Sequence, residues 1–250
     1  MDSLYKTLID QLVVSGKRLL TKTGNVADIG VLKEYLTEED LRIERELVTL
    51  IHGTYPDHHI FAEEEHDQYK DNEDVWVIDP ISGASSFIAG IPHYACVISH
   101  LKNGEPVFAA VYDPSVQELF VAEKGKGTTL NGSPIHVSSD SKKVVYNLSK
   151  KQEGTIAGDK GWDIVHHFSA YRNPASFAVS YCWTAAGRYD GFLSLTKDVF
   201  PEFAGKLILE EAGGVFTSFD GSLDISAEDR EFIGGNQATH AVLLSLTQSL

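Results

Sequence analysis

Acidic residues are concentrated at two points of the chain where they could hold a metal ion. Glu63, Glu64 and Glu65 follow a short apolar run, and Asp79 follows the apolar run of residues 75–78. An acid at the carboxyl end of a strand lies where many sheet proteins bind ligands. Carboxylates beside an anion-binding turn would suit a hard divalent cation that bridges the protein and a phosphate. The alternative is structural: an acid that caps a turn beside a solvated acidic run.

The turn that follows is the second part of this chemistry. Pro80 and Gly83 force the chain to turn, and backbone N–H groups in such a turn could bind an anion if a helix follows directly. We therefore predict that Ser82, Gly83, Ala84 and Ser85 form a phosphate-binding segment. Serine hydroxyls there could also hydrogen-bond a polyol without a metal. A nucleophilic serine is not supported, because no histidine–acid pair is recognisable as its base.

The elements that would position these residues mix helices and strands. Apolar residues at helical spacing predict helices over 3–21 and 38–53. Thr37 is the expected N-cap of the second helix, with Asp40 as its capping-box partner. Between residues 94 and 132, strand-like runs alternate with turn signals, which is typical of an antiparallel meander.

The second half is predicted to follow a polar connector at residues 137–160. After it we expect a helix that ends near Gly187, a strand at 191–195, a helix with Pro201 in its first turn and Gly213 beyond its end, and a closing helix at the end. The predicted fold class is α+β. Its two parts, residues 1–140 and 141–250, would form one compact unit.

The composition excludes several classes of protein. The 250 residues include 21 Lys plus Arg and 36 Asp plus Glu, for a net charge of −15. This balance argues against a nucleic-acid or anionic membrane surface. No apolar run approaches the roughly 18 residues of a membrane span, and the N-terminus lacks the apolar block of a signal peptide. Cys96 and Cys182 are expected to be buried thiols. We expect a cytoplasmic protein with no nucleic-acid or membrane partner.

Six segments, in order, resemble the inositol monophosphatase family of Mg²⁺-dependent, lithium-sensitive phosphomonoesterases. DPISGASSF is similar to the signature DPIDGTxNF, LTEEDLRIERELV to VTxxDxxxExxI, and HIFAEEE to a strand ending in GEE. The meander that begins GIPHYACVISHLKNGEPVFAAVYDP follows the family closely. SFAVSYCWTAAGRYDGF resembles SAALxxxxVAxGRxDxF, and FPEFAGKLILEEAGG resembles WDxAAGxLIxxEAGG. The resemblance implies a layered α/β/α/β sandwich with a site between two subdomains.

The resemblance also implies which residues would act. Glu63, Asp79 and the backbone carbonyl of Ile81 match metal ligands, and Glu64 matches the adjacent acid. In this family one metal ion activates water and another steadies the leaving oxygen. Asp40 matches the acid that helps to orient the attacking water.

The departures from the family pattern fall on the same site. Ser82, Ala84 and Pro201 stand where the family has Asp, Thr and Asp. The second metal position would keep only Asp79, whereas Mg²⁺ relies on carboxylates and substrate phosphate. We therefore expect Mg²⁺ at one weak site at most. The expected consequence is two-metal chemistry that is lost or strongly attenuated.

Nearby residues could alter this conclusion. Asp198 could reach the site from a loop, whereas Glu202 follows Pro201 on a helix and is turned from it by about 100°. Ser194 stands where many members carry an acid that contacts substrate hydroxyls. Arg188 and Asp190 are predicted to form a structural ion pair.

Three functions remain open from the sequence. The first is a phosphate-binding, polyol-binding or repurposed protein of this fold. The second is an active Mg²⁺-dependent phosphatase of inositol, sugar or nucleotide monophosphates. The third is a non-catalytic dimer partner. The expected partners are a small phosphorylated or polyol ligand and, since the family commonly forms dimers, a second copy of the chain.

Overall fold

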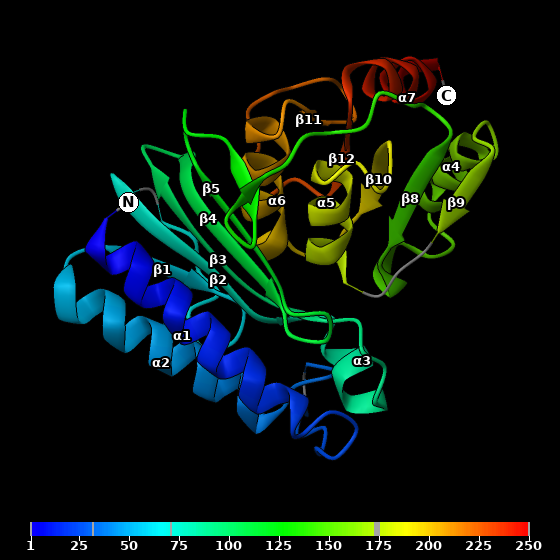
Figure 1. The fold of residues 1–250 in the computed structure, drawn as a ribbon. Coiled ribbons are helices and arrows are strands. Elements are labelled where there is room, and N and C mark those ends of the chain that lie inside the picture. The colour runs from blue at the N-terminus through cyan, green and yellow to red at the C-terminus, as the bar shows by residue number, and fades with distance from the viewer. Residues whose placement is uncertain (1, 32, 71, 173–175, 250) are drawn as a thin grey trace.

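Two β-sheets and their helices are stacked in layers (Figure 1). This is a computed structural model that describes residues 2–31, 33–70, 72–172 and 176–249. The layers run from a helix pair through the first sheet, a second helix pair and the second sheet to an outer helix pair. The predicted α+β class and layered α/β/α/β sandwich are confirmed, with the outer helices as an addition.

The first sheet is the predicted meander with one parallel strand at its edge. Strands β1 and β2 pair in parallel, and the pairs from β2 to β7 are antiparallel. Asn103 and Asn131, each followed by glycine, have φ of 50°, as a two-residue hairpin turn requires. The strands, in spatial order, are β1 (His59–Ala62), β2 (Asp74–Ser82), β3 (Ala95–Lys102), β4 (Glu105–Asp113), β5 (Glu118–Glu123), β6 (Thr128–Leu130) and β7 (Ser133–Pro134).

Helices α1 (Ser3–Leu20) and α2 (Glu38–Thr54) cover one face of this sheet. The leucines of α1 that recur at helical spacing are buried against Trp76 and Ile98. The predicted capping box of α2 is present, with both Thr37 and Asp40 taking part. The two N-terminal helices therefore follow the sequence prediction closely.

The second sheet corrects the sequence prediction for residues 137–160. That segment is not a connector throughout, because it contains β8 (Lys143–Leu148) and the start of α4 (Ile156–Val165). Strand β8 pairs in parallel with both of its neighbours, and three consecutive residues, Val144, Val145 and Tyr146, are buried. The spatial order is β11 (Val215–Ser218), β12 (Glu231–Gly235), β10 (Gly191–Leu195), β8 and β9 (Ala170–Arg172).

Helices α5 (Phe177–Ala185) and α6 (Phe200–Glu211) lie between the two sheets (Figure 1). Their apolar residues belong to one core with Val97 and Ala109 of the first sheet and Phe192 and Phe216 of the second. Gly205 allows the close approach of α6 to α5, because a Cβ there would overlap the Tyr181 ring. Helices α4 and α7 (Gln237–Ser249) cover the outer face of the second sheet.

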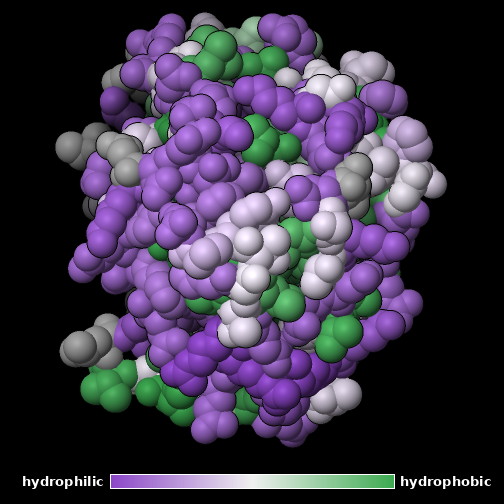
Figure 2. Space-filling view, turned by 90° about the vertical axis from the view of Figure 1, so that its left-hand side faces the viewer, coloured by the Kyte–Doolittle hydropathy of each residue, from purple (hydrophilic) through white to green (hydrophobic). Residues whose placement is uncertain are grey.

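The remaining features concern the thiols and the surface. Cys96 and Cys182 are buried free thiols, as predicted. No helix in the described ranges is long and apolar enough to cross a membrane. The face in Figure 2 is mainly hydrophilic, with a smaller central area of pale and hydrophobic residues.

Candidate functional site

Three acids from distant parts of the chain meet where β1 and β2 end. Glu63 directly follows β1, Asp79 lies in β2, and Asp198 lies between β10 and α6. The charges of Glu63 and Asp198 both act on the Asp79 carboxyl. The structure thus brings together two predicted ligands and the loop acid considered as a substitute.

Glu44 holds the turn at residues 63–66, although the sequence motifs gave this residue no role. Glu44 of α2 is fully buried, and its carboxylate accepts backbone N–H groups of Glu64 and Glu65, each at 2.9 Å. The same carboxylate lies 2.7 Å from His66 Nδ1. Glu44 is four residues after Asp40 and hence on the same helix face, which is the signal that could have identified it.

Two lysines, neither of them predicted, contact the acids. Oε1 of Glu63 is 3.0 Å from Lys33 Nζ and 2.9 Å from Lys197 Nζ. Lys33 Nζ also lies 2.7 Å from Glu64 Oε2, and Lys197 Nζ lies 3.4 Å from Asp198 Oδ2. A lysine in a loop has no periodic pattern, so only the fold places these two beside the acids.

The acids of the cluster have divergent pKa values. Burial raises the pKa of Glu63, but the charges of Lys197 and Lys33 outweigh it and lower that pKa to about 2. For Asp79, burial and then the charges of Glu63 and Asp198 raise the pKa well above its usual range. Burial, together with the Glu63 charge, raises the pKa of Glu64 to about 7. Glu63 therefore carries the negative charge that the two ammonium groups neutralise.

Asp40 has a clear structural role. Its carboxylate accepts the backbone N–H of Thr37 at 2.8 Å and also the Thr37 hydroxyl. Burial raises its pKa to about 7, against the hydrogen bonds from Thr37, and the Glu64 charge adds to the rise. The water-orienting role that the family resemblance assigns to Asp40 stays a prediction.

The predicted phosphate-binding turn has the backbone that such a turn needs. Gly83 has φ of +92°, and a Cβ there would lie 2.9 Å from the His93 carbonyl oxygen. Helix α3 (Ala84–Ala89) begins directly after it. The buried Ser82 hydroxyl accepts a hydrogen bond of 3.1 Å from Ser176 at the start of α5. This bond joins the end of β2 to the second half of the chain.

The other predicted members of this segment are placed without a test of their roles. Ser85, in the first turn of α3, is partly exposed. Ile81 lies near the end of β2 with a buried side chain, and its carbonyl as a ligand stays a prediction.

The residues near Pro201 show which neighbouring acid lies where it could replace the missing carboxylate. Pro201 is buried in the first turn of α6 and offers no ligand atom in its side chain. Glu202 points into the interior, where its Oε1 accepts the Tyr181 hydroxyl at 2.9 Å. The same hydroxyl lies 3.1 Å from the hydroxyl of Ser194. Asp198, not Glu202, is therefore the acid that joins the cluster.

The predicted ion pair between Arg188 and Asp190 is wrong. Arg188 makes a two-pronged contact with Glu118, at 2.7 and 2.5 Å. Asp190 is buried and accepts the backbone N–H groups of Lys142 and Lys143, each at 2.8 Å. Burial raises the pKa of Asp190, but these hydrogen bonds and one from Ser138 lower it below its usual range.

The donor set does not fit the divalent ions that the family resemblance implies. The family resemblance places Ser82 and Pro201, which carry no carboxylate, where the second metal position would have two acids. At the first position Mg²⁺ would need an oxygen of Glu63 at about 2.0–2.1 Å, next to two ammonium groups. Unit charges 4 Å apart repel by about 4 kcal/mol at an effective dielectric constant of 20, and a divalent ion doubles this. Among the described residues, Asp79 Oδ1 is a buried oxygen with no hydrogen-bond partner, so it remains available as a ligand atom.

A separate group, His58, Asp74 and His100, is compact enough to hold a metal ion. Trp76 donates to His58 Nδ1 at 3.0 Å, so the proton of a neutral His58 is on Nε2, 3.7 Å from Asp74. His100 Nε2 lies 2.9 Å from Asp74 and its Nδ1 lies 2.8 Å from the Tyr5 hydroxyl. These contacts satisfy the group as a hydrogen-bonded network, and a metal at His58 Nε2 would require the ring proton to move to Nδ1, which would break the hydrogen bond from Trp76.

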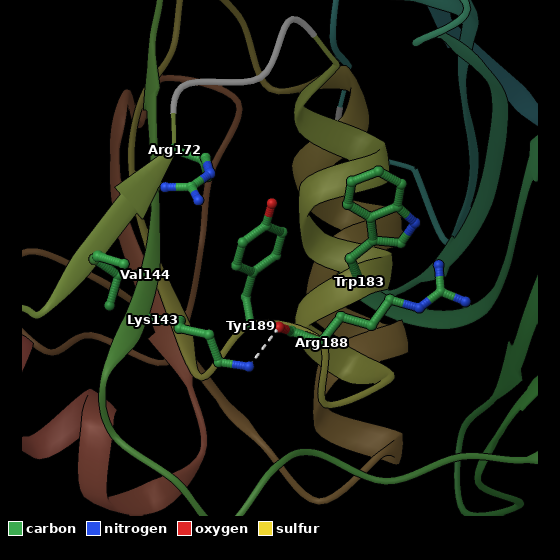
Figure 3. A pocket seen from close by; sticks show the side chains of 7 residues that line it. Lys143, Val144, Arg172, Trp183, Arg188 and Tyr189 are labelled. Carbon is green, nitrogen blue, oxygen red and sulfur yellow. Dashed lines mark hydrogen bonds between the residues drawn. The ribbon is translucent and has the colours of Figure 1, made fainter.

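A cavity of about 340 Å³ lies away from the acids, in the second half of the chain (Figure 3). Arg188 lies over the Trp183 ring at 5.7 Å from its centroid, and Lys143 Nζ donates to the Arg188 carbonyl oxygen at 3.2 Å. The lining residues are Lys143, Val144, Ala170, Arg172, Trp183, Arg188 and Tyr189. None of the acids of the candidate site lines it, so the two are separate features.

Comparison with known proteins agrees with the fold and the motifs. "Nus factor SuhB" of Vibrio cholerae is 31% identical over 223 residues, 86% of this chain and 84% of that protein. "Fructose-1,6-bisphosphatase/inositol-1-monophosphatase" of Aquifex aeolicus is 30% identical over 233 residues, 91% of this chain and 86% of that protein. The solved structure of a Thermotoga maritima IMPase superposes with a TM-score of 0.86 at 27% identity, over 100% of this chain and 98% of that one.

The names of these relatives correct one expectation. The exclusion of nucleic acid, drawn from net charge, is contradicted at the level of the family by relatives called Nus factors. Net charge alone therefore does not exclude such a partner. Residues 2–250 match the inositol monophosphatase family, and the chain belongs to that family.

Proposed function

We propose that this protein binds a small phosphorylated or polyol ligand and that two-metal phosphomonoesterase chemistry is lost or strongly attenuated in it. The observation that carries this proposal is the Ser82 hydroxyl, buried and hydrogen-bonded to Ser176 where the family pattern has a carboxylate ligand. Pro201 removes a second carboxylate and Ala84 removes the hydroxyl that helps to orient water.

The size of the loss follows from what the second ion does. Steadying the leaving oxygen contributes several kcal/mol of transition-state stabilisation. Because about 1.4 kcal/mol corresponds to a tenfold rate change, losing this interaction alone slows hydrolysis by several decades. Asp198 Oδ2 lies 3.4 Å from Lys197 Nζ, and this contact competes with any role of Asp198 as a replacement ligand.

The ligand class rests on the groups that remain. The backbone at Gly83 is left-handed and α3 begins directly after it, so the first N–H groups of that helix have no partner within the helix and could bind an anion. Hydroxyls of Ser82 and Ser85 offer hydrogen bonds to a phosphate or a polyol. The name of the Aquifex aeolicus relative, a phosphatase of fructose and inositol phosphates, supports this class for the present chain.

Two experiments on the purified chain test the proposal together. Calorimetry should detect binding of at least one inositol, sugar, polyol or nucleotide monophosphate, or of a free polyol. Phosphate release from the same panel with Mg²⁺ or Mn²⁺ should not exceed that of the Asp79→Asn variant. Release that Asp79→Asn abolishes would show an active Mg²⁺-dependent phosphatase instead. Absence of both binding and release would leave the non-catalytic dimer partner as the better account, with size-exclusion chromatography as its check.

A further inference from the structure

Two ammonium groups from separate parts of the chain converge on one carboxylate of the candidate site. Lys33 precedes α2, Lys197 lies between β10 and α6, and Glu63 follows β1. Both Nζ atoms lie within 3.0 Å of the same oxygen, Oε1 of Glu63. Each also contacts a second acid, Glu64 for Lys33 and Asp198 for Lys197.

This arrangement reproduces two properties of a bound divalent cation. Together the two ammonium groups carry a charge of +2. Each one also bridges carboxylates that come from different positions, which is how a metal ion ties such a site together. Lys33 additionally donates to the backbone carbonyl oxygen of Glu63 at 3.2 Å, so this turn is held through both its side chain and its main chain.

We propose that Lys33 and Lys197 take the place of the divalent cation at Glu63, so that the cluster is neutralised from within and disfavours metal binding. The inference builds on the proposed function, because it names what replaces the metal at that same site. It also gives Glu63 a role that needs no metal, because its carboxylate contacts both ammonium groups.

Burial separates this cluster from ordinary surface ion pairs. The side chains of Glu63 and Glu64 are 13% and 3% exposed, whereas those of Lys102 and Glu73 in a surface pair are 52% and 67% exposed. Exposed pairs contribute little, but a buried carboxylate without a partner is strongly unfavourable. A cation beside Glu63 therefore stabilises the folded chain, and Lys33 and Lys197, whose side chains are 32% and 45% exposed, supply it.

The missing ligands and the two lysines both disfavour metal binding at the site. Ser82 and Pro201 reduce the negative charge that would attract a metal ion, and the ammonium groups oppose its approach to Glu63. If this is correct, removing one ammonium group without adding any ligand should increase metal affinity at the site.

The test is Mn²⁺ binding to the full-length chain, measured by electron paramagnetic resonance of the free ion. We compare the wild type with Lys197→Met, which keeps the length of the side chain and removes its charge. Lys142→Met is the matched control, because the Lys142 side chain is 67% exposed and pairs only with Asp140 among the ion pairs of the described residues. We expect Lys197→Met to bind Mn²⁺ at least tenfold more tightly than the wild type, and the control to match the wild type.

A second substitution locates the gained ion. Asp79→Asn added to Lys197→Met should abolish the gain, since Asp79 Oδ1 is a buried oxygen without a hydrogen-bond partner among the described residues. Should Lys197→Met fail to fold, Lys33→Met removes the other ammonium group and carries the same expectation. Wild-type binding as tight as that of the lysine variant would overturn the proposal, and so would a folded lysine variant with no gain.

The Mn²⁺ affinity can be measured whether or not the protein releases phosphate from a substrate. Phosphate release by the wild type would refute the proposed function, whereas Mn²⁺ affinity would still report whether the lysines compete with a metal. The two ideas can therefore fail separately.

Discussion

Removal of the Lys197 ammonium group should destabilise the folded chain by an amount that can be worked out from Glu63. Burial raises the pKa of Glu63, and the two lysines outweigh this effect, so that the net pKa is about 2 instead of the usual 4.5. At about 1.4 kcal/mol per pKa unit, this difference corresponds to about 3 kcal/mol of stability at neutral pH. Lys33 and Lys197 share that contribution, so Lys197→Met should lower the free energy of unfolding by about 1–2 kcal/mol.

The lowered pKa of Glu63 determines how this loss of stability depends on pH. A carboxyl with a depressed pKa in the folded state contributes stability above its unfolded pKa, and the contribution is lost as the pH falls through the folded pKa. The part of the difference between wild type and variant that comes from Glu63 should therefore decrease as the pH falls from 4.5 toward 2.

Urea denaturation followed by circular dichroism at pH 7, 5 and 3.5 measures this difference. Lys142→Met serves as the control and should leave the unfolding free energy within about 0.5 kcal/mol of wild type. An unchanged stability of Lys197→Met at pH 7 would refute the reasoning. So would a loss of equal size at pH 7 and 3.5, because it would not come from the Glu63 charge.

Three further predictions concern stability and can be measured by urea denaturation. Asp190→Asn should lower the free energy of unfolding by about 1–3 kcal/mol at pH 7. Because the pKa of Asp190 is lowered in the folded chain, this loss should become smaller below pH 3.8. A loss that does not change with pH would contradict the prediction. Gly83→Ala should cost about 1–3 kcal/mol, because φ is +92° and the new Cβ would lie 2.9 Å from the His93 carbonyl oxygen; a neutral effect would mean that the turn is not constrained. Gly205→Ala should cost about 1–3 kcal/mol by forcing α6 away from the Tyr181 ring, and unchanged unfolding would show that the two helices can separate freely.

The parts of the fold that follow from local chemistry were predictable. Helix α1 has leucines at helical spacing, and the start of α2 is specified by Thr37 and Asp40 three residues apart. The hairpin turns at Asn103 and Asn131 are specified by an asparagine followed by glycine. In each case the residues that determine the structure lie within a few positions of one another.

The parts that depend on distant contacts were not predictable in the same way. Arg188 is two residues from Asp190, yet its partner is Glu118, 70 residues away. Lys33 and Lys197 carry no pattern that distinguishes them from surface lysines before the fold places them at Glu63.

Strand β8 was also not predicted from the sequence, because its apolar run is short. Strand β8 has only a brief apolar run, Val144 to Tyr146, within a polar segment, and its first residue, Lys143, is exposed. Its assignment depends on the neighbouring strands β10 and β9, which lie later in the sequence.

The central claim is that hydrolysis was lost together with the carboxylate ligands, and the most direct test is to restore them. The measurement is Mg²⁺-dependent phosphate release, over a panel of inositol, sugar and nucleotide monophosphates, by the variant Ser82→Asp, Pro201→Asp, Lys197→Met. We predict release above that of the wild type, abolished when Asp79→Asn is added. A folded variant that neither binds Mg²⁺ more tightly nor releases phosphate would contradict the claim, because the missing ligands would not then explain the loss.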